Sequence, residues 1–319
     1  MTGRARHLEL PFTGPATFFK AEQRSLTSLA AGDFHVGVLG VPYDFAVGFR
    51  PGARFGPAAV RSATGRYAVG PAGYYDFESD AHRLVGAALV DAGDVDVAQL
   101  ETGESLARVE AAAAALRAAV ELPVFVGGDH SMSYPLLRAY GDVPRLHVVQ
   151  LDAHLDYSAQ RNATRYANSS PFRRAVEALP GLVKITTIGL RGVRADSEAF
   201  AAARARGHEL VSARAVRADL AAVIERLPRG ESVYLSVDVD ALDAAELPGT
   251  GSPEPEGLTY GQVRDLVAAT ARRNRLVGVD LMELAPDLDP TGRSALLAAR
   301  LLAETLVAWW EARGGGSQA

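Results

Sequence analysis

The sequence contains no cysteine, and lysine occurs only twice, at Lys20 and Lys184. The absence of thiols excludes disulfide bonds, cysteine nucleophiles and zinc–thiolate sites. Arginine therefore supplies nearly all of the positive charge, and 33 basic residues against 38 acidic ones leave a net charge of −5. This modest balance gives no indication of a nucleic-acid partner or of binding to a membrane surface.

Long apolar runs are also missing. None reaches membrane-spanning length, and the first residues lack the apolar segment of a signal peptide. We therefore expect a cytoplasmic protein. Its 319 residues suffice for one large α/β domain, and no repeat or Pro/Gly/Ser-rich linker divides them. The expected organisation is an N-terminal arm over residues 1–33, a single domain over 34–313 and a frayed tail over 314–319.

Strand-like and helix-like segments alternate along this domain, which is typical of the α/β class. Apolar and β-branched runs predict strands near residues 35–41, 86–91, 122–127, 146–151, 183–189, 208–211, 232–237 and 275–281. Helices are expected near residues 57–66, 103–119, 131–140, 171–178, 196–206, 215–227, 259–273 and 293–312. The most apolar strand runs have the composition of buried parallel strands.

Polar clusters follow three of these strands, at Gly127–Ser131, Asp152–Asp156 and Ser236–Asp243. Because open α/β sheets bind their ligands at the carboxyl ends of the strands, we expect these clusters to form one site. Together they offer six side chains that can ligate a metal, namely His130, Asp152, His154, Asp156, Asp238 and Asp240. This set is too large for one ion with an open position, and it suits two.

The spacing of the six side chains supports a two-metal site. Alternate residues of a strand share one face, so Asp152, His154 and Asp156 can converge if the strand end stays extended, and Asp238 and Asp240 can do so from a second strand. Carboxylates and imidazoles without thiolates suit Mn²⁺ and could also hold Zn²⁺, Co²⁺ or Ni²⁺. Each cluster alone could be a polar loop, whereas three in one chain favour the metal interpretation.

These clusters, in this order, resemble the ureohydrolase family, which comprises the arginases, agmatinases and guanidino-acid hydrolases. The resemblance runs from about Gly37 to Leu306 and includes four further segments, Gly40–Asp44, Arg50–Pro57, Pro248–Pro253 and Gly278–Pro286. The Arg50–Pro57 segment is more similar to agmatinase-type members than to arginases. The resemblance implies a three-layer α/β/α fold with a mainly parallel eight-stranded sheet, two Mn²⁺ ions per chain and a homo-oligomer, either a trimer or a hexamer.

The family mechanism implies a role for each ligand. Water activated by the two metals attacks a planar amidine carbon, and urea and an amine are released. One ion would be held by His130, Asp152, Asp156 and Asp238, and the other by Asp152, His154, Asp238 and Asp240, with Asp152 and Asp238 bridging. Asp156 could also carry a proton to the leaving nitrogen. Glu283 matches the family glutamate that pairs with the substrate guanidinium.

The loop after Asp156 departs from the family pattern. Agmatinase-like members carry a histidine there that relays a proton to the departing amine, whereas Asn168 stands at this position within Tyr166–Arg174. An asparagine can orient a group by hydrogen bonding, but it cannot gain or lose a proton near neutral pH. Loss of a general acid–base group typically costs about 10²–10⁴-fold in rate. Asn168 therefore bears on the identity of the substrate more than on the class of reaction.

Three functions therefore remain open. The favoured one is a manganese-dependent amidinohydrolase that cleaves agmatine or a guanidino acid such as 4-guanidinobutyrate to urea and an amine. Arg50, Arg161 and Arg165 lie in loops from which any one could bind a carboxylate tail. The alternatives are a formimidoyl-amino-acid hydrolase, whose family branch also lacks that histidine, and a metal-binding but catalytically silent member. The more distant one-zinc deacetylases are disfavoured because His130 and Asp240 complete a second metal set.

Overall fold

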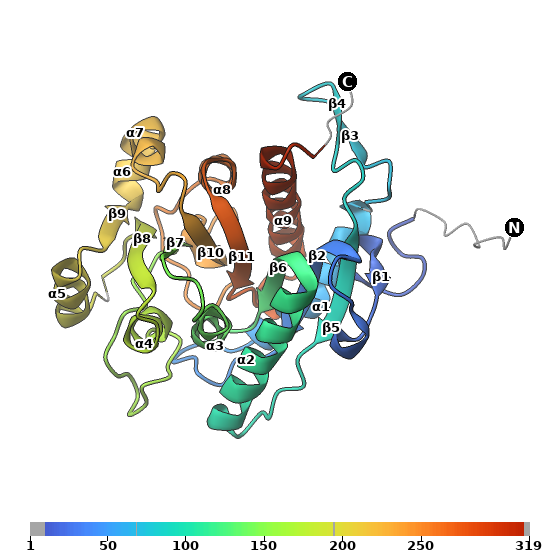
Figure 1. The fold of residues 1–319 in the computed structure, drawn as a ribbon. Helices are drawn as coiled ribbons and strands as arrows, with labels where there is room; N and C mark the ends of the chain where they lie inside the picture. The colour runs from blue at the N-terminus through green and yellow to red at the C-terminus, as the bar shows by residue number, and fades with distance from the viewer. Residues whose placement is uncertain (1–9, 68, 194, 316–319) are drawn as a thin grey trace, which may run out of the picture.

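The computed structural model describes residues 10–67, 69–193 and 195–315. A parallel sheet of nine strands forms its centre, in the order β1-β5-β2-β6-β11-β10-β7-β8-β9 (Figure 1). The strands are β1 (Glu22–Gln23), β2 (Phe34–Val41), β5 (Leu89–Asp94), β6 (Val120–Gly127), β7 (Leu146–Leu151), β8 (Leu182–Leu190), β9 (Glu209–Ser212), β10 (Ser232–Asp238) and β11 (Arg275–Met282). All eight predicted strands are present, which confirms the α/β fold class.

The ninth strand corrects the predicted strand number. Glu22–Gln23 pairs in parallel with β5 at the edge of the sheet. Both side chains are exposed, so no apolar run in the sequence predicts this strand. Nearby, Phe18 and Phe19 are fully buried, and the Phe18 amide donates to Asp91 Oδ2 at 2.9 Å. The described part of the predicted arm thus packs on the sheet. Residues 1–9 of that arm and 316–319 of the predicted tail lie outside the described residues.

Helices cover both faces of the sheet and complete the three layers (Figure 1). One core contains side chains of α1 (Gly56–Thr64), α6 (Ala213–Ala218), α7 (Leu220–Glu225), α8 (Tyr260–Arg273) and α9 (Arg293–Ala312). The other contains side chains of α2 (Thr102–Ala119), α3 (Ser133–Arg138), α4 (Pro171–Ala178) and α5 (Ser197–Ala205). Among the described helices, none is long and apolar enough to cross a membrane.

Smaller elements connect these layers. A two-stranded antiparallel hairpin, β3 (Tyr74–Asp76) with β4 (Ala81–Arg83), was not predicted. The helix predicted over 215–227 is interrupted at Asp219, whose side chain accepts from the Ala222 amide at 2.9 Å and caps α7. Short 3₁₀ turns occur at Phe18–Lys20, Leu26–Ser28, Ala53–Phe55, Gly65–Tyr67, His130–Met132, Val239–Ala241 and Pro286–Leu288.

The order of the four central strands positions the polar clusters. β6, β11, β10 and β7 are neighbours, so the residues that follow them meet at one edge of the sheet. The register places Asp238 opposite Met282 of β11, and Val237 opposite Leu151 of β7. Asp152 therefore follows directly beside Asp238. His130 and Glu283 approach from the other two strand ends.

Candidate metal centre

The imidazole of His130 faces three carboxylates in the interior of the protein. Its Nδ1 lies 3.2 Å from Asp152 Oδ2, 3.1 Å from Asp156 Oδ2 and 3.2 Å from Asp238 Oδ2. His130 is completely buried, and Nδ1 has no hydrogen-bond partner among the described residues. Although burial alone would lower the pKa of His130, the three carboxylates raise it well above its ordinary value. This excess of buried negative charge is what a cation would neutralise.

A hydrogen-bonded chain behind His130 determines which ring nitrogen faces the carboxylates. His130 Nε2 lies 2.9 Å from Ser236 Oγ, which donates its hydrogen to Asp280 Oδ1 at 2.6 Å. Because the hydroxyl has only one hydrogen, Nε2 must donate to Ser236. The neutral imidazole then presents the lone pair of Nδ1 to the carboxylate cluster. This is the arrangement of a metal-ligating histidine with a partner behind it.

A second group of ligand atoms lies beside the first. His154 Nδ1 lies 3.0 Å from Asp240 Oδ2 and 3.6 Å from Asp152 Oδ1. Asp152 belongs to both groups, one oxygen in each, and is placed to bridge two ions. Asp238 falls only in the His130 group, and its other oxygen accepts from the Asp240 amide at 2.8 Å. The predicted bridging role of Asp238 stays a prediction.

The electrostatics of the combined site favour cations. Four carboxylates and two imidazoles converge in a largely buried region, without sulfur ligands, and this donor set suits divalent metal ions. Burial and the neighbouring Asp152 raise the pKa of the Asp156 carboxyl to about 7. Burial and the charges of Asp240 and Asp152 likewise raise the pKa of Asp238. In the absence of ions, these carboxylates cannot all be charged near neutral pH.

Polar side chains inside two buried strands support the ligands. Gln150 Nε2 donates to Asp152 Oδ2 at 2.7 Å, and its Oε1 accepts from Thr187 Oγ1 at 2.8 Å. Asp280 accepts from Ser133 and Tyr234 in addition to Ser236. Gln150 and Asp280 were not predicted from the sequence as supporting residues. The available signal was a polar side chain within an otherwise apolar strand, which requires a buried partner.

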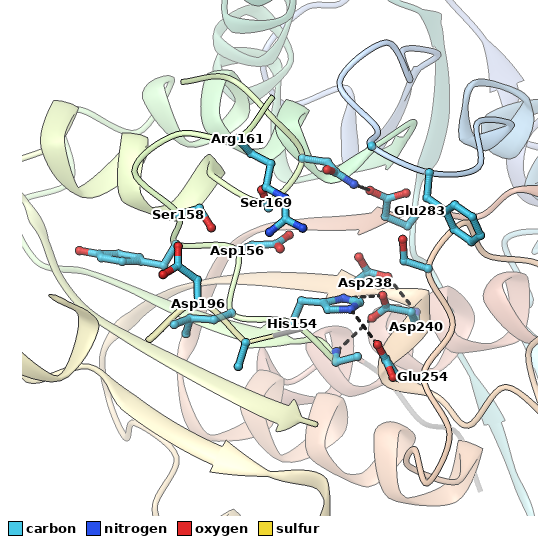
Figure 2. Close-up of a pocket in the computed structure, with 18 of the residues that line it drawn as sticks. His154, Asp156, Ser158, Arg161, Ser169, Asp196, Asp238, Asp240, Glu254 and Glu283 are labelled. Carbon is cyan, nitrogen blue, oxygen red and sulfur yellow. Dashed lines mark hydrogen bonds and ion pairs between the residues drawn. The ribbon is translucent and has the colours of Figure 1, made fainter. Parts of the chain in front are cut away.

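A cavity of about 400 Å³ opens above the two ligand groups (Figure 2). Its wall includes Glu283, whose Oε1 accepts from the His130 amide at 3.0 Å and from Asn168 Nδ2 at 3.1 Å. No hydrogen bond from a described residue reaches Glu283 Oε2, which is free to accept from a ligand. Burial raises the pKa of Glu283. Its backbone is left-handed, with φ of 66°, a strained conformation often found at functional sites.

The predicted substrate-binding residues separate in the structure. Asn168, Arg50 and Arg161 line the cavity. Arg165 is not among the residues that line the cavity: it is exposed and pairs with Glu177 at 2.7 Å, so its predicted role in substrate binding has no support in this geometry. Its loop turns back at residues 161–164, so Arg161 and Arg165 point to different surroundings. Arg191 also lines the cavity and was not singled out from the sequence.

Comparisons with known proteins show which family the chain resembles in sequence and fold. The model of the Arginase family matches residues 34–308. Formimidoylglutamase of Halobacterium salinarum is 38% identical over 86% of this chain and 88% of its own length. Guanidinopropionase of Pseudomonas aeruginosa is 36% identical over 93% of each chain. The solved proclavaminate amidino hydrolase of Streptomyces clavuligerus is 30% identical, with a TM-score of 0.82 over 95% of this chain and 99% of its own.

Proposed function

The chain belongs to the arginase family and is a hydrolase of C–N bonds in linear amidines, and on this premise we propose that it is a manganese-dependent amidinohydrolase. It cleaves a linear guanidino compound, agmatine or a guanidino acid such as 4-guanidinobutyrate, to urea and an amine. One observation carries this proposal. Glu283, whose Oε2 accepts no hydrogen bond from a described residue, lines the same cavity as residues of the two ligand groups, so a guanidinium bound to it would lie beside the metal site.

Two divalent ions held by the six ligands would supply an activated water molecule and stabilise the charge that develops on the amidine group. Glu283 binds the planar guanidinium through Oε2, while the contacts to Oε1 hold the carboxylate in place. Asp156 lines the cavity beside the ligand groups, where its carboxylate would take a proton from the activated water and pass it to the leaving nitrogen. Asn168 orients Glu283 and transfers no proton.

A formimidoyl-amino-acid hydrolase is the second candidate. Two points favour it: the family resemblance places Asn168 where a proton-relaying histidine is expected, and the chain is 38% identical to a formimidoylglutamase. A formimidoyl group is also a planar amidine that can donate to Glu283. The two candidates differ in their products, because a guanidino substrate releases urea whereas a formimidoyl substrate releases formamide or ammonia.

The proposed function is tested with Mn²⁺-loaded protein and a panel of agmatine, 4-guanidinobutyrate, 3-guanidinopropionate and N-formimidoyl-glutamate. Urea release supports the amidinohydrolase. Formamide or ammonia release from the formimidoyl substrate alone supports the second candidate. No turnover, with the metals bound, would identify a catalytically silent member.

Glu283→Gln is the first specific prediction. The glutamine keeps a carbonyl oxygen but has no negative charge, so the hydrogen bond to the substrate guanidinium loses its charged acceptor. We expect unchanged metal content and a fall in kcat/KM of about 10²-fold or more. Metal content is measured by elemental analysis and turnover by urea release. An unchanged kcat/KM would show that the guanidinium is held elsewhere.

We also propose, from the family resemblance, that the protein is a homo-oligomer, a trimer or a hexamer. The exposed aromatic side chains of Phe45, Phe49 and Phe55 are consistent with this, because exposed apolar side chains close together in a chain often belong to protein interfaces. Light scattering coupled to size-exclusion chromatography measures the mass directly. A monomer at micromolar concentration would contradict the proposal.

A further inference from the structure

Three arginines of the described residues line the cavity, and two of them donate to backbone carbonyls. Arg50 donates from Nε to Gly251 O and from Nη2 to Thr250 O, both at 3.1 Å. Arg191 donates from Nη2 to the carbonyls of Asp240, Leu242 and Glu254, at 2.6–3.1 Å. The side chain of Arg161 makes no hydrogen bond or ion pair with any described residue, and only its backbone is paired, with Thr164. Among the described cavity residues, it is the arginine whose donors are free.

The backbone beneath Arg161 is held in a tight turn. Arg161 and Thr164 exchange two backbone hydrogen bonds, each of 2.9 Å. The two residues between them, Asn162 and Ala163, have φ of 50° and 59°, as in a type I′ hairpin turn. Figure 2 shows the half-buried Arg161 side chain pointing from this turn into the cavity. A fixed backbone limits the entropy lost when the side chain binds a ligand.

Two acidic side chains of the cavity have partners of their own. Asp196 Oδ1 accepts from the amides of Glu198 and Ala199, at 3.0 and 3.4 Å, and caps α5. Glu254 Oε1 lies 3.8 Å from His154 Nε2, beside the metal ligands. Asp196 Oδ2 accepts no hydrogen bond from a described residue and could pair with an amine tail, but that tail would share the cavity with the Arg161 cation. A carboxylate tail would instead satisfy the guanidinium, with two parallel hydrogen bonds.

We propose that Arg161 binds the carboxylate tail of the substrate, so that the substrate is a guanidino acid and not the amine-tailed agmatine. This inference rests on the proposed amidinohydrolase function and names its substrate class. Glu283 holds the guanidinium beside the metal ligands, and Arg161 holds the opposite end of the molecule. Arg161 therefore determines that the site prefers a substrate with a negatively charged tail to one with a positively charged tail.

The test compares 4-guanidinobutyrate with agmatine, because both carry a terminal charge on a short chain but the signs are opposite. The wild type should have the higher kcat/KM for 4-guanidinobutyrate. Arg161→Gln should raise KM for that substrate about 10–100-fold, since charged hydrogen bonds contribute about 1.5–3 kcal/mol. It should leave kcat and Mn²⁺ content nearly unchanged and should not weaken turnover of agmatine.

Arg165→Gln is the matched control, because it removes an equal charge from the same loop but outside the cavity. It should change neither KM. Preference for agmatine, with Arg161→Gln having no effect on either KM, would overturn the inference and leave the amidinohydrolase proposal standing. In that case, an Asp196→Asn variant with weakened agmatine turnover would locate the amine tail.

Calorimetry tests the inference without turnover if no guanidino compound of the panel releases urea, an outcome that would refute the proposed function instead. The Mn²⁺-loaded wild type and Arg161→Gln are then titrated with 4-guanidinobutyrate. Binding to the wild type that weakens about 10-fold or more in the variant supports a carboxylate subsite at Arg161. Equal affinity for the two proteins, or no binding to either, overturns it.

Discussion

Asn168 donates to Glu283 Oε1 at 3.1 Å from the position where the family resemblance predicts a histidine. The contact shows that residues 166–174 reach the candidate site. The amide completes the hydrogen bonds of Glu283 Oε1 together with the His130 backbone. It cannot protonate a leaving amine, so this single residue bears directly on which chemical step limits turnover.

Asn168→His should raise kcat for urea release if protonation of the leaving amine limits the reaction. General acid–base groups contribute about 10²–10⁴-fold, so even a poorly placed imidazole should give a severalfold increase. Asn168→Ala is the control, because it removes the contact with Glu283 without adding an ionisable group. For a formimidoyl substrate, the histidine should instead lower activity. Unchanged turnover on every substrate would exclude this loop from the reaction.

His208 provides a pH-dependent prediction away from the metal centre. Burial and the charges of Arg206 and Lys184 lower its pKa to about 4. Its Nδ1 accepts from the Ile185 amide at 3.3 Å, and its buried Nε2 lacks a described partner. The folded protein therefore keeps this ring neutral below pH 6.5, whereas the unfolded chain takes up a proton. Stability contributed by His208 is complete above about pH 6.5 and is lost as the pH falls toward 4.

His208→Asn keeps an acceptor for the Ile185 amide and removes the titration. Between pH 6.5 and 4, the wild type should lose up to about 3 kcal/mol more unfolding free energy than the variant, less any solvent screening. Urea unfolding in the presence of EDTA measures the difference. His82→Asn is the control, because this side chain is already exposed in the folded state. Parallel pH profiles for wild type and His208→Asn would contradict the assignment.

At the scale of elements, the register of β10 against β11 positions the side chains that support His130 and its group of ligands. Ser236 lies opposite Asp280, and the Ser236 hydroxyl links this carboxylate to His130 Nε2. A shift of one residue in the register would turn these side chains to opposite faces and break the link. The strand pairing, and not the local sequence of either strand, therefore orients the His130 ring.

Ser236→Ala should weaken Mn²⁺ binding about 10–100-fold, the usual effect of removing a partner behind a ligating histidine. The fold should persist, because the change is small and buried. Ser232→Ala is the matched control in the same strand, since Ser232 accepts from the exposed Arg275 at the opposite end. Titration of Mn²⁺ into metal-free protein measures the affinity. Equal Mn²⁺ affinities for Ser236→Ala and Ser232→Ala would show that the hydrogen bonds from His130 through Ser236 to Asp280 are not needed for metal binding.

At the scale of the whole molecule, the candidate metal centre joins segments that are distant in the chain. Its six ligands follow β6, β7 and β10, and they span residues 130–240. Ions that bind only this folded arrangement stabilise it by mass action, by about 2.7 kcal/mol at a free concentration of 100 times Kd. They also neutralise the mutual repulsion of four neighbouring carboxylates, three of which are buried.

Metal-free protein should bind two equivalents of Mn²⁺ and melt at a higher temperature once loaded. Asp240→Ala should retain one equivalent, because it removes a ligand of the His154 group and leaves the His130 group complete. Elemental analysis and scanning calorimetry, with and without EDTA, measure both effects. One equivalent in the wild type that is unaffected by Asp240→Ala would contradict a two-metal centre.

The sequence alone determined the strands, most helices and the six candidate ligands. Apolar runs and helical periodicity are local properties, and parallel strands carry their polar residues at their carboxyl ends. The exposed two-residue strand at Glu22–Gln23 and the break at Asp219 were missed, because neither changes the apolar pattern.

Only the tertiary structure decided how the ligands are grouped and which loop side chains face them. Asp152 belongs to both groups because β7 lies beside β10, and β11 and β6 lie on the far side of β10. Arg161 and Arg165 are chemically equivalent in the sequence, and a hairpin turn sends the first into the cavity and leaves the second on the surface. Contacts between strands and loops depend on strand order and turn geometry, which side-chain periodicity does not encode.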